Sequence, residues 1–111
     1  NIECGKLISN IEKDLVKEKS EKKVLIDIRF AEVFYSRKVN SCLYVVEYYD
    51  PEIVASGPFV IHLRNALTNT NIDSFTIGLP GFFSYFNEDG STNTETWAKL
   101  EYTRKEIDSY R

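Results

Sequence analysis

The spacing of apolar residues changes twice along this chain, and no other feature constrains the fold as strongly. From Cys4 to Leu15 apolar residues recur every three or four positions, which is the period of one helix face. From Val24 to Leu79 they mostly alternate with polar residues, which is typical of strands. The helical spacing returns after Thr92. The pattern predicts an α+β fold with an N-terminal helix, a four-stranded antiparallel sheet built from two hairpins, and a C-terminal helix.

The first hairpin is expected to turn at residues 37–40. Before this turn the apolar positions change parity after Phe30, which predicts either a β-bulge near residues 31–32 or two separate strands. In the second hairpin, a three-residue loop at 69–71 would pair Leu63 with Ile77 and bring the apolar faces of both strands together. We therefore expect that register.

The terminal segments are expected to cover the sheet. Thr92 and Glu95 form a capping-box pattern, which predicts the start of the C-terminal helix at about residue 93. Because adjacent antiparallel strands need only one covered face, both helices are expected to lie on the same face.

Length and charge narrow the class of protein. The 111 residues suit one domain over residues 1–111, and the 42% of hydrophobic residues is enough for a packed core. With 14 basic and 17 acidic residues the net charge is −3, which gives no electrostatic reason to bind nucleic acid. No apolar run approaches the ~20 residues of a transmembrane helix.

The segment Phe34–Val45 combines an aromatic-Tyr-Ser opening, a short basic turn and an Asn-Ser-Cys close. About a dozen residues long, it resembles a hairpin of small, uncharacterised domains of bacterial exported proteins. The resemblance implies a secreted or periplasmic location and transfers no catalytic residue; a cytoplasmic location is the alternative.

The chain has two cysteines. Cys4 lies on the apolar stripe of the first predicted helix, and Cys42 lies on the strand face that also carries Tyr44 and Val46. Both therefore point toward one core. An oxidising compartment favours a Cys4–Cys42 disulfide, whereas in the cytoplasm both would be free thiols.

Residues 79–86 contain four aromatic side chains between a predicted strand and a turn. Such a segment either completes the core beneath the C-terminal helix or forms an exposed contact surface. In an extended segment Phe83 and Tyr85 share one side, and the Tyr hydroxyl favours a wet rim. We expect these two side chains to be exposed and to contact a protein partner or a second copy of the chain.

His62 is the only histidine, and it shares a strand face with Arg64. Asp73 is expected on the other face, so no catalytic triad assembles around His62. One His and two separated Cys are too few soft ligands for zinc, and the sequence predicts no catalytic residue, metal or cofactor.

Two functions are compatible with these features. The first is a non-catalytic binding or accessory module that acts through its sheet or through the aromatic loop 79–86. The alternative is a small-ligand-binding or enzymatic domain, with a cavity between helix and sheet near His62 and Arg64.

Overall fold

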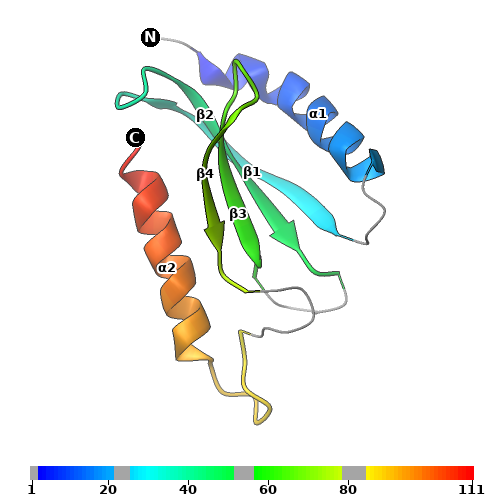
Figure 1. The fold of residues 1–111 in the computed structure, drawn as a ribbon, viewed down its shortest axis with the longest axis vertical. Coiled ribbons are helices and arrows are strands. Elements are labelled where there is room, and N and C mark those ends of the chain that lie inside the picture. The colour runs from blue at the N-terminus through cyan, green and yellow to red at the C-terminus, as the bar shows by residue number, and fades with distance from the viewer. Residues whose placement is uncertain (1–2, 22–25, 52–56, 79–84) are drawn as a thin grey trace.

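A four-stranded antiparallel sheet lies between one helix from each end of the chain (Figure 1). This computed structural model describes residues 3–21, 26–51, 57–78 and 85–111. The strands pair in chain order as two successive hairpins, which confirms the predicted α+β fold. The elements are η1 (Cys4–Leu7), α1 (Ile8–Glu21), β1 (Asp27–Ser36), β2 (Ser41–Tyr49), β3 (Val60–Asn65), β4 (Asn71–Thr76) and α2 (Thr94–Asp108).

A β-bulge explains the parity change in the first hairpin. The register between β1 and β2 shifts between Phe30 and Glu32, so Ala31 is the extra residue. The bulge returns the apolar side chains to one face, and Phe30 and Val33 pack against the same buried cluster. Asn40 closes the turn in the left-handed conformation, with φ 54°.

The second hairpin has a longer turn than predicted. Leu63 pairs with Asp73 instead of Ile77, a shift of four residues. The Asn65 side chain stabilises this turn, because its Oδ1 accepts hydrogen bonds from two turn N–H groups at 2.9 and 3.3 Å. Since this shift is an even number of residues, the side chains of residues 73–76 keep their predicted faces. A further irregularity at Ile72 pairs Arg64 with Asn71 and places the Asn71 side chain on the face of His62. Asn69 supplies the left-handed turn conformation, with φ 56°.

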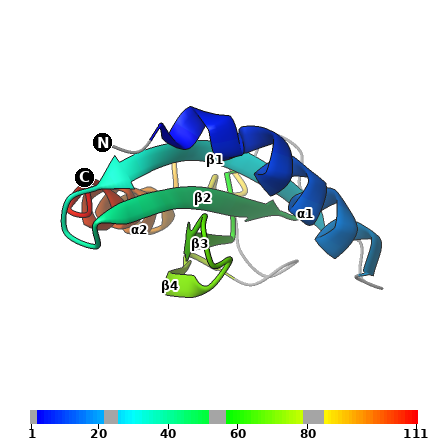
Figure 2. The same cartoon turned by 90° about the horizontal axis from the view of Figure 1, so that it is seen from above.

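The two helices cover opposite faces of the sheet, so the expectation that they share one face is wrong (Figure 2). The cluster beneath α1 contains Ile11, Leu15, Tyr44, Val46, Tyr48 and Phe59. The cluster beneath α2 contains Leu43, Val45, Ile61, Leu63, Ile77, Tyr85, Leu100 and Ile107. The unbroken apolar run of β2 is the physical reason, because residues 42–46 are buried on both faces and each face needs a cover.

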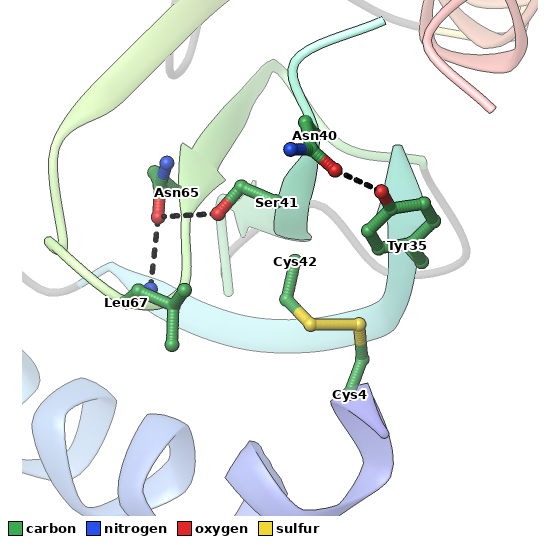
Figure 3. The surroundings of a disulfide bond; sticks show 7 residues. All are labelled: Cys4, Tyr35, Asn40, Ser41, Cys42, Asn65 and Leu67. Atoms are coloured by element: carbon green, nitrogen blue, oxygen red, sulfur yellow. Dashed lines mark hydrogen bonds between the residues drawn. A yellow bond between two sulfur atoms is a disulfide. The ribbon is translucent and has the colours of Figure 1, made fainter. Parts of the chain in front are cut away.

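A disulfide fixes the start of the first helical segment to the sheet (Figure 3). Cys4 in η1 is bonded to Cys42 in β2, and their Cα atoms are 5.6 Å apart. The structure therefore contains the predicted bridge. It closes a loop that includes all of α1 and β1.

Both ends of α2 are held by side chains. At its start the side chain of Asn93 accepts a hydrogen bond from the Thr96 N–H at 3.3 Å, so the cap lies one residue after the predicted Thr92. At its end Arg111 forms an ion pair with Glu32 of β1. The helix consequently crosses the sheet from the loop that precedes it to the bulged strand.

Candidate functional site

Tyr85 lies in the core, so the prediction that it is an exposed partner contact is wrong. Its side chain is 0% exposed, and its hydroxyl donates a hydrogen bond to the Pro58 carbonyl oxygen at 2.6 Å. Its ring packs edge-on against Trp97, with the centroids 4.8 Å apart. A Cβ on Gly57 would lie only 2.6 Å from this ring. The hydroxyl therefore finds its acceptor inside the protein, which removes the reason to place it at a wet rim.

The other predicted contact, Phe83, lies outside the described residues. Of the segment 79–86, the structure describes Tyr85 and Phe86. Phe86 is exposed and lies 6.3 Å from the Trp97 ring, measured between centroids. The part of the aromatic segment that the structure describes thus contributes one ring to the core and one to the surface.

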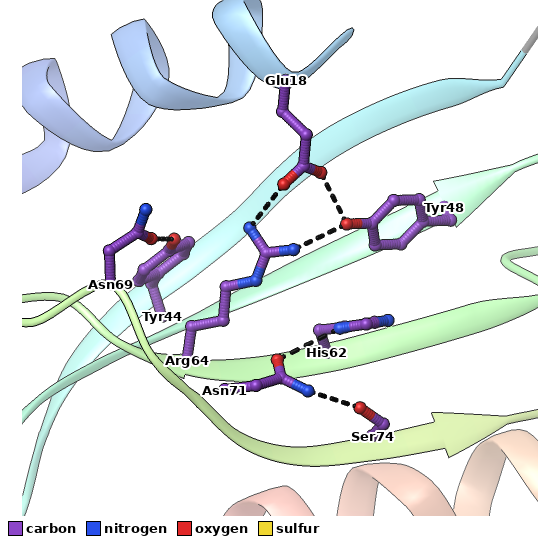
Figure 4. Close-up of polar contacts among 8 residues, drawn as sticks. All are labelled: Glu18, Tyr44, Tyr48, His62, Arg64, Asn69, Asn71 and Ser74. Carbon is purple, nitrogen blue, oxygen red and sulfur yellow. Dashed lines mark hydrogen bonds and ion pairs between the residues drawn. The ribbon is translucent and has the colours of Figure 1, made fainter. Parts of the chain in front are cut away.

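Arg64 belongs to a polar cluster that holds α1 against the sheet (Figure 4). One of its terminal nitrogens lies 3.1 Å from Glu18 Oε1 of α1, and the other donates to the Tyr48 hydroxyl at 2.8 Å. That hydroxyl donates in turn to Glu18 Oε2 at 2.6 Å. Three side chains from three elements therefore satisfy one another's hydrogen bonds.

Burial keeps these groups in fixed ionisation states. Burial and the adjacent Glu18 carboxylate raise the pKa of the Tyr48 phenol, so it stays protonated and donates. The pKa of Arg64 is also raised: hydrogen bonds to tyrosine and Glu18 outweigh the opposing effect of burial. The cluster is an ion pair of Arg64 and Glu18 with no net charge, and the Tyr48 hydroxyl is hydrogen bonded to both residues. The Arg64 guanidinium therefore holds α1 against the sheet.

His62 lies beside this cluster, on the face of the sheet predicted from the sequence. Its Nδ1 is 3.1 Å from Asn71 Oδ1, and the Asn71 amide donates to Ser74 Oγ at 2.6 Å. The ring also contacts Tyr48, with centroids 5.0 Å apart. Asp73 pairs with Leu63 and lies on the other face, as predicted. The arrangement is a polar surface on β3 and β4 (Figure 4).

A second candidate site lies between β4 and α2, and we call it the edge groove. It has a volume of about 520 Å³ and is lined by Phe75 and Thr76 of β4 and by Ala98, Tyr102 and Thr103 of α2, among others. Tyr102 is 61% exposed and is the largest aromatic surface on this part of α2. The groove thus combines apolar walls with a strand at its border.

The border strand presents main-chain groups on the side away from β3, and one of them, the Ser74 N–H, donates to Asp73 Oδ1 at 2.9 Å. Ile77 N–H donates to the Phe59 carbonyl at 2.8 Å, which shows which groups of the strand face β3. Because these groups alternate in direction along a strand, the N–H and C=O of Ser74 and Thr76 face away from β3. In the described part of the sheet no strand lies on that side of β4. The outer edge of β4 is therefore open beside the groove.

The opposite edge of the sheet is protected in three ways. β1 is bulged at Ala31, it carries charged side chains such as Asp27 and Arg29, and η1 and α1 pack against it. Natural sheets use such devices to prevent pairing with another chain. β4 is irregular only at Ile72 and carries one charged side chain, Asp73. Over residues 73–76 it pairs regularly with β3, and the exposed side chains of that stretch are Ser74 and Thr76.

The edge groove is a site that sequence reasoning missed. Phe75 and Tyr102 are far apart in the chain, and only the observed register and the crossing of α2 bring them together. A signal was nevertheless present, because Tyr102 falls outside the apolar positions that the C-terminal helix buries. An aromatic residue on the exposed part of a helix is a marker of contact surfaces.

Within the described residues no three metal-ligating side chains gather, and no helix there is long and apolar enough to cross a membrane. No protein-family model, no curated protein and no solved structure matches the chain.

Proposed function

We propose that this chain is a non-catalytic binding module that captures an extended segment of a partner protein as a fifth strand on β4. The observation that carries the proposal is the open outer edge of β4 beside the apolar edge groove. Peptide recognition by strand addition uses main-chain hydrogen bonds for affinity and side-chain pockets for specificity. The Ser74 carbonyl and the Thr76 N–H and carbonyl would supply the main-chain hydrogen bonds, because the Ser74 N–H is held by Asp73. Phe75 and Tyr102 would form the side-chain pocket.

The chemistry of the partner segment follows from the two sides of β4. Side chains of an added strand alternate between the faces of the sheet. On one face they would meet the apolar walls formed by Phe75 and Tyr102. On the other they would meet Ser74, Thr76 and the polar surface around His62. The best partner is therefore an extended segment that alternates apolar and polar residues.

The disulfide supports a site of action outside the cytoplasm, because such bonds persist in oxidising compartments. The alternative function, a ligand cavity at His62 and Arg64, has less support. The Arg64 guanidinium is already bound by Glu18 and Tyr48.

The test is selection of short random peptides displayed on phage against the intact chain and two Thr76 variants. Thr76→Pro removes the outward N–H, and edge strands tolerate proline at such positions. Thr76→Ala keeps the N–H and is the matched control. We expect selected peptides to bind the alanine variant like the wild type. The proline variant should bind about tenfold more weakly, or worse, through the loss of a main-chain hydrogen bond.

Amide hydrogen exchange provides a second readout that does not depend on the proline variant. A bound peptide should slow exchange at the Thr76 amide. Equal peptide binding by the proline variant, or unchanged exchange at Thr76 with peptide bound, would overturn the proposal. Enrichment of no peptide would do the same.

A further inference from the structure

A small hollow opens on the α2 face of the sheet, away from the edge groove. It has a volume of about 200 Å³, and its floor consists of Val45 and Ile61 from the sheet and Ile107 from α2. Pockets for drug-sized ligands span roughly 300–1,000 Å³, whereas one water occupies about 30 Å³. The hollow therefore suits a molecule the size of a small metabolite.

Charged side chains surround this apolar floor, and some of them neutralise each other. Arg111 pairs with Glu32 on the β1 side, and its Nε also binds Asp108 at 2.9 Å. Glu47 and Arg104 line the same hollow. Within the described part of the chain neither of these two forms an ion pair. Two opposite charges thus face one hollow without contacting each other.

Tyr49 holds Glu47 in position. Its hydroxyl donates to Glu47 Oε1 at 2.8 Å, and the Arg29 guanidinium lies 4.1 Å from the centre of its ring. Burial and the Glu47 carboxylate raise the pKa of Tyr49 to about 12, while Arg104 acts in the opposite direction. The phenol therefore stays a donor at neutral pH, and one carboxylate oxygen of Glu47 is fixed while the other remains available.

From this arrangement we infer that the hollow binds a small zwitterion with an apolar body, of the class of free aliphatic α-amino acids. Arg104 would bind the carboxylate, and Glu47 would bind the ammonium group. The aliphatic side chain would cover Val45 and Ile61. A ligand with both charges satisfies both residues, whereas a ligand with one charge leaves a partner in the hollow uncompensated.

This site is independent of the proposed strand addition. It is lined by β1, β2, β3 and the last turns of α2, and it shares no residue with the edge groove. The Thr76→Pro variant should therefore bind the amino acid like the wild type.

The experiment is an NMR titration of the intact, oxidised chain with L-leucine. Isocaproate and isoamylamine, which carry the same body with one charge each, are the comparison ligands. We expect saturable shifts of the Val45, Ile61 and Ile107 amides with leucine. The two comparison ligands should bind about tenfold more weakly or worse, as expected when one charge-assisted contact is lost.

Two variants and one control locate the binding groups. Arg104→Gln and Glu47→Gln should each weaken leucine binding by about tenfold or more, since each removes one charged partner. Lys105→Gln is the control, because Lys105 lies on the same helix but pairs with Glu101 outside the hollow. Absence of saturable shifts would overturn the inference, as would unchanged binding in both variants. Equal affinity for isocaproate would show a simple anion site and would also overturn it.

Discussion

Replacing Tyr85 tests most directly whether its ring is part of the core beneath α2. The ring is fully buried, contacts Trp97 and fills the space above Gly57. Truncating a buried aromatic ring costs about 3–5 kcal/mol, so Tyr85→Ala should destabilise the protein by that amount. Tyr85→Phe removes only the hydrogen bond to Pro58 and leaves its carbonyl oxygen buried, which costs about 1–3 kcal/mol.

Thermal unfolding followed by circular dichroism measures both effects. At about 4 °C per kcal/mol for a chain of this size, Tm should fall by about 12–20 °C for the alanine variant. The phenylalanine variant should lose about 4–12 °C. A loss under about 1 kcal/mol for Tyr85→Ala is typical of surface substitutions and would refute a core position for the ring.

Gly57→Ala makes the test more specific. In the wild type the new Cβ would lie 2.6 Å from the Tyr85 ring, and such overpacking costs about 1–3 kcal/mol. In the Tyr85→Ala background the same methyl group enters the space left by the ring, so its cost should disappear. A coupling energy near zero between the two substitutions would show that the side chains do not touch.

Three further results are expected. Reduction of the disulfide, which spans 38 residues, should lower the free energy of unfolding by about 4 kcal/mol on the chain-entropy estimate, measured by urea denaturation; an intact-mass measurement should find the oxidised chain lighter by two hydrogen atoms. Arg64→Met alone should lower the free energy of unfolding by more than the double variant Arg64→Met with Glu18→Leu, because the single variant leaves the Glu18 carboxylate without its cation. Equal losses in the two variants would contradict an energetic coupling between Arg64 and Glu18. The hydrogen bond from Arg29 lowers the pKa of Asp27 in the folded protein. The pair therefore stabilises the fold above the unfolded-state pKa of about 4, and this contribution is lost as the pH falls through the lower pKa of the folded state. In Arg29→Gln an NMR titration should find the Asp27 pKa nearer its ordinary value.

Local patterns predicted the elements well because each is specified within a few residues. The helical spacing around Ile11, the bulge at Ala31 and the turn at Asn40 all depend on neighbours in sequence. The Cys4–Cys42 pairing was also accessible, since both residues lie on apolar faces. These features need no knowledge of how the layers stack.

The stacking itself depends on contacts that local patterns do not encode. One feature did indicate two covered faces: the apolar run of β2 is unbroken, and a strand with one wet face would alternate. The burial of Tyr85 depends on Gly57 and Pro58, which lie 27 or more residues away in sequence. The register of β3 and β4 depends on the turn that the Asn65 side chain stabilises. Apolar pairing favoured Ile77 opposite Leu63, whereas the observed register places Asp73 there.

The disulfide also determines how tension would travel through the molecule. A pull applied to the chain before Cys4 passes through the sulfur atoms directly into β2, the strand covered on both faces. The α1 helix and β1 lie inside the covalent loop, so this load bypasses them and cannot peel them away one after the other. After reduction the same pull would act first on η1 and α1. Among the described contacts, two polar links then hold α1 to the sheet: Glu18 with Arg64 and Tyr48, and Lys19 with Asp27. Oxidation thus moves the point of mechanical failure from the outer layer of the fold to its centre.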